Sequence, residues 1–193
     1  MSTGIPIRHA GFKSADSKSQ EWTAVYKAVC KIAGCGGIVA LCGGRGVGKT
    51  QLGVCLVNLV IRQPDPNDKY RRLTGQYIKA YDFFLRVREA MKTPGDSERT
   101  AVNEFIRPYM LVIDALEVSK GTDYEYQLLD HVIDKRYDNE RPTLIISNDT
   151  PEVISQRLGP SIIDRMRDAG GILTLNIPSF RGTPKPQSQR GDN

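Results

Sequence analysis

The stretch that decides the fold is Gly43-Gly44-Arg45-Gly46-Val47-Gly48-Lys49-Thr50, which directly follows the apolar run Ile38-Val39-Ala40-Leu41-Cys42. It matches the pattern G-x-x-x-x-G-K-[ST] of a Walker A loop. Glycines in such a loop let successive backbone N–H groups turn toward phosphate oxygens, the lysine reaches the β- and γ-phosphates, and the hydroxyl ligates Mg²⁺. Apolar residues at helical spacing follow, so the phosphates would meet the positive end of a helix. The order strand, loop, helix predicts that residues 43–50, with Gln51 behind them, bind ATP, and that Thr50 holds Mg²⁺.

The composition fits one soluble domain. The chain has 193 residues, of which 39% are hydrophobic and 25% charged, enough to bury a core without a disulfide or metal staple. No apolar run approaches the length of a membrane span, and residues 1–20 are polar rather than signal-like. We therefore expect a cytoplasmic protein without a membrane partner. The net charge of +5 is compatible with nucleic-acid binding but does not by itself indicate it.

Strands and helices alternate through the middle of the chain. Strand patterns cover residues 38–42, 76–79, 109–113, 143–147 and 171–175, and helical patterns cover residues 49–62, 81–91 and 124–137. A Pro/Asp/Asn-rich loop separates the first helix from the second strand, a polar helix precedes the third strand, and two short helices are expected within residues 151–168. This alternation predicts an α/β fold with a parallel sheet and helices on both of its faces. Residues 1–20 and 182–193 contain few apolar side chains and are expected to be flexible ends.

The third predicted strand ends in Leu111-Val112-Ile113-Asp114, which has the Walker B form of an apolar run closed by an acid. Asp114 would emerge beside the Walker A loop and hold Mg²⁺. Such a run alone is weak evidence, because buried strands often end in Asp. Its position after the Walker A loop, with one strand-helix unit between them, supports the assignment.

Two further positions suit phosphoryl chemistry, each with a plain alternative. Asn148, at the end of the fourth predicted strand, can orient the attacking water against the γ-phosphate. Its alternative is a role in capping the helix that begins near Pro151. Arg165 can act as an arginine finger on the nucleotide of a neighbouring subunit. Its alternative is a surface ion pair with Asp164 or Asp168.

The helix expected near residues 81–91 carries two stripes of side chains. The expected core face consists of Ala80, Phe84, Val87 and Met91, and the second face consists of Tyr81, Leu85, Arg88 and Lys92. The two faces lie about 100° apart on a helix. An aromatic side chain and two cations at this spacing fit a single strand of DNA. A solvated face or a helix contact within an oligomer explains the second stripe as well.

Several segments beyond the Walker motifs carry a family resemblance. They are Asp130-His131-Val132-Ile133-Asp134-Lys135-Arg136-Tyr137, Arg141-Pro142-Thr143, Ser147-Asn148 and Asp164-Arg165-Met166-Arg167. With the two Walker motifs, they resemble the ATPase domain of DnaC-type replicative helicase loaders and, more distantly, IstB-type transposition ATPases. The resemblance covers residues 36–181. It implies a P-loop NTPase of the ASCE/AAA+ type, a three-layer sandwich with sheet order 5-1-4-3-2 and no separate lid domain. Residues 1–35 would then be a partly flexible extension, and residues 182–193 a flexible tail.

The resemblance also implies a function. It implies ATP hydrolysis, homo-oligomers in the ATP state, single-stranded DNA binding and a replicative helicase as partner. By position, Asn148 corresponds to sensor I, Arg165 to the arginine finger, and Arg181 to a late basic residue of such domains. The expected role is therefore to load or remodel a helicase in DNA replication. Regulation of DNA transposition, with a transposase as partner, is the alternative.

The chain departs from the family pattern after Asp114. The family normally has glutamate at the next position to polarise the attacking water, whereas this chain has Ala115. Glu117 is the nearby carboxylate that could substitute, so we expect slow hydrolysis unless Glu117 reaches the water. An ATP-gated adaptor with weak hydrolysis is therefore a further alternative.

The second departure is length. Residues 1–35 are too few for the N-terminal helicase-binding domain of these loaders, which favours a short phage or mobile-element form. A small P-loop kinase of metabolites is a different class for which the length is suitable. The extra strand between the two Walker strands and the placement of Asn148 and Arg165 disfavour it.

Overall fold

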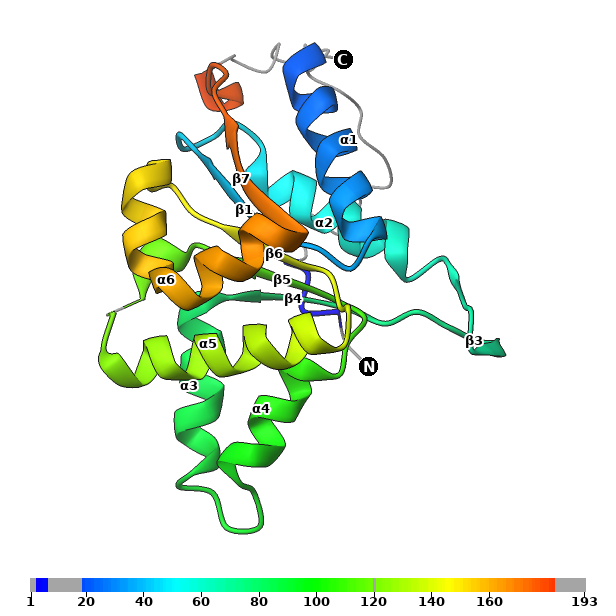
Figure 1. The fold of residues 1–193 in the computed structure, drawn as a ribbon, viewed down its shortest axis with the longest axis vertical. Coiled ribbons are helices and arrows are strands. Elements are labelled where there is room, and N and C mark those ends of the chain that lie inside the picture. The colour runs from blue at the N-terminus through cyan, green and yellow to red at the C-terminus, as the bar shows by residue number, and fades with distance from the viewer. Residues whose placement is uncertain (1–2, 7–18, 120, 183–193) are drawn as a thin grey trace, which may run out of the picture.

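The computed structural model describes residues 3–6, 19–119 and 121–182 (Figure 1). The main sheet has five parallel strands in the order β4-β5-β6-β1-β7. They are β1 (Ile38–Gly43), β4 (Gly75–Lys79), β5 (Met110–Asp114), β6 (Thr143–Ile146) and β7 (Gly170–Leu175). Counted along the chain within this sheet and read from β7, the order is 5-1-4-3-2, so the predicted fold is confirmed. The flexible ends expected over residues 1–20 and 182–193 lie largely outside the described residues.

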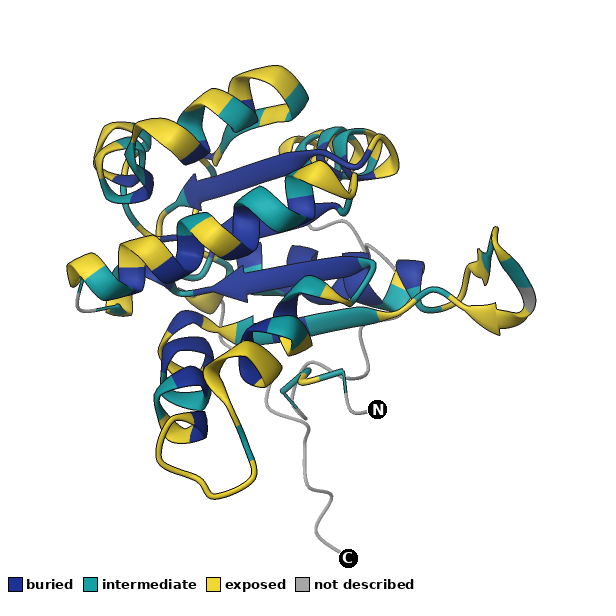
Figure 2. Ribbon diagram, turned by 60° about the horizontal axis from the view of Figure 1, so that its bottom comes forward, coloured by how far each residue is buried: buried dark blue, intermediate teal, exposed yellow. Residues whose placement is uncertain are grey.

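The three central strands are continuous apolar runs because helices cover both of their faces. Every residue of β5 and β6 is buried. Along β1, Val39 and Leu41 face one core, while Ile38, Ala40 and Cys42 face the other. The sheet therefore forms the middle layer of the molecule, and Figure 2 shows its central strands in the dark blue of buried residues.

The helices divide between the two faces of the sheet. On one face lie α1 (Gln20–Gly34) and α2 (Lys49–Val60). On the other lie α3 (Ala80–Ala90), α4 (Glu98–Ile106), α5 (Asp123–Asp138) and α6 (Pro151–Ala169). Gly53 lets α2 approach the sheet closely, because a Cβ there would lie 2.9 Å from Val112 Cγ1. Among the described residues, no helix is both long enough and apolar enough to cross a membrane.

Helix α1 was not predicted. Ser19 caps it by accepting a hydrogen bond from the backbone N–H of Trp22 at 3.1 Å. Trp22, Val29 and Ala33 lie on one buried face and pack against the core shared with α2. Apolar residues recur along it at helical spacing, at Trp22, Val25, Tyr26, Val29 and Ala33, so the sequence carries the signal of this helix and the prediction overlooked it.

The loop predicted after α2 is instead an antiparallel hairpin of β2 (Pro64–Asp65) and β3 (Asp68–Arg72). Its turn is stabilised by Asp65, whose Oδ1 accepts from the backbone N–H of Asn67 at 2.9 Å. The prediction of a loop was wrong because the strands are short and lack an apolar alternation.

Helix α3 differs from the expected core face at its end. Met91 is 52% exposed, because α3 ends at Ala90. Phe83 and Ala90 complete the core face instead. The two short helices expected within residues 151–168 are confirmed as two helical parts of α6, separated by a kink at Gly159 with φ 76° and ψ 167°.

Candidate nucleotide site

The predicted site residues gather at the carboxyl edge of the sheet. Because the strands are parallel, the ends of β1, β5 and β6 meet at this edge. A cavity of about 450 Å³ lies there. Its lining includes the predicted residues Arg45, Gly46, Gly48, Lys49, Thr50, Gln51, Asp114, Glu117 and Asn148. Val47 packs in the core instead.

Lys49 lies at the centre of this cavity. Its Nζ donates to the backbone oxygens of Gly43 and Gly44, both at 2.7 Å, and to Asn148 Oδ1 at 2.8 Å. Burial lowers the pKa of Lys49, and the charges of Asp114 and Glu117 act in the opposite direction. The ammonium group is thus buried among oxygen atoms that a phosphate can replace.

Two elements hold the Walker A loop from its two sides. Trp22 Nε1 of α1 donates to the backbone oxygen of Gly48 at 3.2 Å. The backbone N–H of Phe180, in the short helix η3 (Phe180–Gly182), donates to the oxygen of Gly46 at 3.0 Å. Both glycines have positive φ, 84° at Gly46 and 93° at Gly48, and a Cβ on Gly46 would lie 2.1 Å from Ser179 Oγ. The loop conformation therefore requires glycine at both positions.

The Walker B carboxylate is held at both of its oxygens. Asp114 Oδ2 accepts from Thr50 Oγ1 at 2.7 Å and from the hydroxyl of Tyr77, and Oδ1 accepts from the backbone N–H of Ala115 at 2.8 Å. The two residues predicted to hold Mg²⁺ are therefore in direct contact. Mg²⁺ typically takes one or two carboxylates and completes its shell with phosphate oxygens and water. The described part of the chain contains no cluster of three or more His, Cys, Asp or Glu side chains that could hold a metal ion.

A turn at Ala115 brings Glu117 back to the cavity. Ala115 has left-handed backbone angles, φ 60° and ψ 48°, and precedes the short helix η2 (Leu116–Val118). Glu117 Oε2 accepts from the backbone N–H of Asn148 at 3.1 Å and from Ser147 Oγ at 3.2 Å, and Oε1 accepts from Asn148 Nδ2. Asn148 thus links Lys49 to Glu117, and the structure brings all three predicted residues together.

Arg165 lies on α6 and does not line the cavity. Its guanidinium donates to Asp130 Oδ1 at 3.3 Å, to Asp134 Oδ1 and to Ser161 Oγ. The alternative prediction was an ion pair of Arg165 with Asp164 or Asp168, whereas the observed ion pairs are with two aspartates of α5. The side chain is 21% exposed.

The second stripe of α3 is divided. Arg88 donates to Glu125 Oε1 at 3.2 Å, and this carboxylate is buried, so Arg88 connects α3 to α5. Tyr81 and Lys92 are exposed, and Leu85 is half-buried. The three residues predicted to bind DNA therefore do not form one unpaired surface.

Sequence reasoning missed several residues of the site. Trp22, Tyr77, Lys79 and Phe180 all contact the Walker A loop or line the cavity, and Arg181, noted only through the family resemblance, also lines it. Trp22 is the only tryptophan of the chain and is 2% exposed, but its position in the sequence carries no hint of the loop it packs against. Tyr77 lies within a predicted strand, and only the sheet register places its hydroxyl near Asp114.

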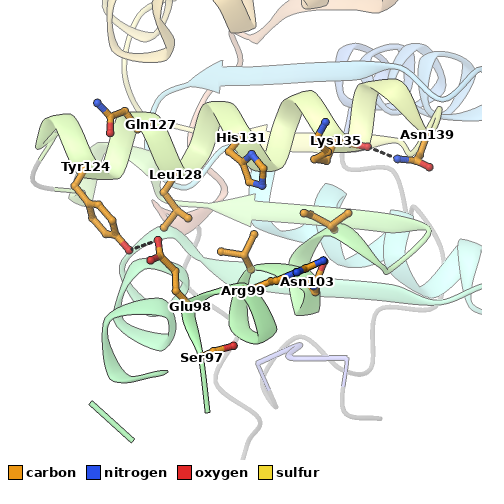
Figure 3. A pocket seen from close by; sticks show the side chains of 12 residues that line it. Ser97, Glu98, Arg99, Asn103, Tyr124, Gln127, Leu128, His131, Lys135 and Asn139 are labelled. Carbon is orange, nitrogen blue, oxygen red and sulfur yellow. Dashed lines mark hydrogen bonds between the residues drawn. The ribbon is translucent and has the colours of Figure 1, made fainter. Parts of the chain in front are cut away.

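A second hollow of about 720 Å³ lies between α4 and α5 (Figure 3). Tyr124 donates to Glu98 Oε1 at 2.9 Å across it, and His131 points into it from α5. It is larger than the cavity at the sheet edge. Its lining contains no residue of the Walker motifs, so the phosphate chemistry belongs to the smaller cavity.

Comparisons with known proteins agree with this geometry. A family model described as IstB-like ATP binding protein matches residues 12–188. The replicative helicase loader DnaC of Escherichia coli strain K12 is 26% identical over 140 residues, which cover 72% of this chain and 54% of that protein. The chain thus spans about half the length of the curated relatives it matches.

Two solved structures illustrate the similarity of fold. A crystal structure of the DnaC helicase loader has a TM-score of 0.69 at 19% identity, covering 88% of this chain and 99% of that one. The replication initiator DnaA bound to AMPPCP and single-stranded DNA has a TM-score of 0.67 at 16% identity, covering 90% of this chain and 51% of that one. At such identities the similarity establishes the fold alone.

Proposed function

Because the chain belongs to the family of IstB-like ATP binding proteins, we propose that it is an AAA+ ATPase that binds single-stranded DNA and loads or remodels a replicative helicase. The observation that carries the ATPase part is the connected set of polar groups at the cavity. Lys49, Asn148 and Glu117 are joined by hydrogen bonds beside the Thr50–Asp114 contact. These hydrogen bonds connect the Walker A loop, which would hold the phosphates, to the carboxylate of Glu117.

The residues present fit Mg²⁺-ATP. The backbone of residues 43–50 would cradle the phosphates, and Lys49 would exchange its three oxygen partners for phosphate oxygens. Thr50 and Asp114 would hold Mg²⁺, which when bound neutralises charge on the β- and γ-phosphates. Arg181 lines the same cavity and adds positive charge close to Lys49.

Glu117 is proposed as the base in hydrolysis. It would accept a proton from water as the water oxygen bonds to the γ-phosphorus and the bond to the β–γ bridging oxygen breaks. Asn148 already donates to Glu117 and would orient both the carboxylate and the water. Glu117 thus takes the role that the family assigns to a glutamate directly after the Walker B aspartate.

Arg165 is proposed to act in trans within an oligomer formed in the ATP state. It lies outside its own cavity, on α6, and its partners Asp130 and Asp134 are carboxylates on the surface of α5. Arg165 is only partly exposed, but a phosphate carries more negative charge than a carboxylate and accepts bidentate hydrogen bonds, so a phosphate of a neighbouring subunit could compete for the guanidinium.

The proposed binding of DNA and of a helicase is supported by similarity to known proteins. The matching curated protein is a replicative helicase loader, and a structure of similar fold holds single-stranded DNA. The family model, however, takes its description from IstB-like proteins. This observation keeps an ATPase that regulates DNA transposition as the second candidate.

Two measurements test the proposal. Calorimetry should detect Mg²⁺-ATP binding by the full chain and none by Lys49→Ala, because the phosphates lose the one cation of the loop that is buried beside them. Capture of partners in buffer containing ATP, with Lys49→Ala as the matched bait, should retain a replicative helicase in an ATP-dependent manner. Retention of a transposase instead would support the second candidate, and equal ATP affinity of the two proteins would refute the nucleotide site.

A further inference from the structure

The β2–β3 hairpin, with the two residues that precede it, forms a surface that the proposed function does not use. We call residues 62–72 the basic hairpin, because they contain four cationic residues and two acidic ones. In Figures 1 and 2 the strands of this hairpin project away from the layers of the fold. It enters β4 at the amino edge of the sheet, opposite the edge that carries the nucleotide cavity.

The two carboxylates of the basic hairpin are engaged in local hydrogen bonds. Asp65 Oδ1 accepts from the N–H of Asn67 at 2.9 Å, and Asp68 Oδ1 accepts from the N–H of Tyr70 at 3.0 Å. Asp68 Oδ2 also lies 3.3 Å from Arg71 Nε. These bonds order the turn and leave the surface with an excess of positive charge. The Arg71 side chain remains 79% exposed, and an ion pair this exposed yields readily to a phosphate.

The base of the hairpin is closed by hydrogen bonds to the segment that follows α2. The guanidinium of Arg72 donates to the backbone oxygen of Arg62, and the N–H of Leu73 donates to the oxygen of Gln63 at 3.0 Å. Pro64 and Pro66 restrict the opposite strand and the turn. The projecting residues are therefore held in a defined arrangement, which lowers the entropy that a ligand contact would cost.

Tyr70 lies at the centre of the projecting strand and is 86% exposed. In the sequence it stands directly before Arg71 and Arg72. An exposed aromatic ring next to cations is the chemistry that binds single-stranded nucleic acid, because every base offers a face for stacking and phosphates follow at regular intervals. A protein partner would require an apolar surface that these residues lack.

We propose that the basic hairpin contacts single-stranded DNA, with Tyr70 stacking on a base and Arg71 pairing with an adjacent phosphate. The inference rests on the proposed DNA-binding function and assigns that function a surface. It differs from the prediction made for Tyr81, Arg88 and Lys92, on α3 and just after it, where Arg88 already pairs with the buried Glu125.

The test is fluorescence anisotropy of a labelled oligodeoxythymidylate, titrated with the full chain in the presence of Mg²⁺ and a non-hydrolysable ATP analogue. Tyr70→Ala should weaken binding about tenfold, because one stacked base is lost. Tyr70→Phe should bind as the wild type does, since the ring is kept. Tyr81→Ala, the matched aromatic change on α3, should have little effect.

The salt dependence tests the phosphate contact separately. Arg71→Gln should reduce the slope of log affinity against log salt by about 0.7, the value expected for one lost phosphate on a single strand. Arg99→Gln removes the same charge from an exposed position on α4 and should leave the slope unchanged. ATP affinity should be the same in all five variants, because none of the changed residues lines the nucleotide cavity.

The outcomes separate the two proposals. If the wild type binds the oligonucleotide and Tyr70→Ala and Arg71→Gln bind equally well, the hairpin inference is overturned while the proposed DNA binding stands. If the wild type itself fails to bind, the DNA-binding function and the inference fall together. Weakening by Tyr81→Ala but not by Tyr70→Ala would move the contact to α3 and also overturn the inference.

Discussion

Tyr77 adds a hydroxyl to the Walker B aspartate. It donates to the same Asp114 oxygen as Thr50 does, so one hydrogen bond would keep the carboxylate oriented when Thr50 turns to Mg²⁺. Tyr77→Phe keeps the buried ring and removes this donor. A hydrogen bond of ordinary strength corresponds to a roughly two- to tenfold change, so the Mg²⁺ concentration for half-maximal ATP turnover should rise by that factor. An unchanged Mg²⁺ titration curve would show that the Tyr77 hydroxyl is not required to orient the Asp114 carboxylate.

Ala115 determines where Glu117 lies. Its φ of 60° is unfavourable for any residue with a Cβ, and most unfavourable for a β-branched one. Ala115→Val should therefore lower the free energy of unfolding by about 1–3 kcal/mol and reduce ATP turnover, because the turn that returns Glu117 to Asn148 is disfavoured. Ala115→Gly adopts the same turn freely and should keep the turnover of the wild type. Urea unfolding and steady-state turnover measure both effects, and full activity in Ala115→Val would contradict this account of the turn.

At the scale of elements, the kink in α6 depends on Gly159. Its φ of 76° and ψ of 167° belong to a region that is essentially restricted to glycine, and no atom within 4 Å would obstruct a Cβ. Gly159→Ala should thus cost about 1–3 kcal/mol of stability through backbone strain alone. Gln156→Ala, at an exposed helical position of the same element, should be nearly neutral. Equal urea midpoints for the two variants would show that the kink tolerates a side chain.

Helix α5 places the buried Arg136 among backbone oxygens. The guanidinium donates to the carbonyl oxygens of Phe105, Ile106, Pro108, Tyr109 and Pro142. It also donates to Thr143 Oγ1 at 2.7 Å. The residue thereby joins the end of α4 to the starts of β5 and β6. Arg136→Met leaves several buried carbonyls without a donor, each worth about 1–3 kcal/mol, so the loss of stability should exceed about 3 kcal/mol. Lys135→Met, at the neighbouring position whose side chain is 45% exposed, should change stability far less, and similar losses in the two variants would contradict the bridging role.

At the scale of the whole molecule, the trans role of Arg165 predicts complementation. Arg165→Ala subunits keep an intact cavity but supply no finger, and Lys49→Ala subunits supply a finger but bind no ATP. Each protein alone should therefore be inactive, while a mixture should recover part of the wild-type ATP turnover. A mixture that stays inactive, under conditions in which the wild type assembles and hydrolyses ATP, would argue against a finger from the neighbouring subunit.

The parts of the molecule that the sequence predicts share one physical property. Asp114 and Asn148 stand at or just after the end of an apolar strand, and a short loop joins Lys49 and Thr50 to the end of another. Parallel pairing gathers such ends without further information. The β2–β3 hairpin could not be predicted with the same rule, since its strands are short and lack an apolar alternation. Helix α1 does carry an apolar helical period, which the prediction overlooked. Tyr77 and Arg136 reach their partners through sheet register and helix packing, which spacing in the sequence does not encode.

The central claim is that Glu117 replaces the missing Walker B glutamate in ATP hydrolysis, and single-turnover hydrolysis by Glu117→Gln tests it most directly. The amide keeps the size of the side chain and most of its hydrogen bonds but cannot accept the proton from water. The account predicts ATP affinity close to that of the wild type and a hydrolysis rate lower by about 10²-fold or more. Hydrolysis by Glu117→Gln at the wild-type rate in the presence of single-stranded DNA, together with a faster rate in Ala115→Glu, would contradict it.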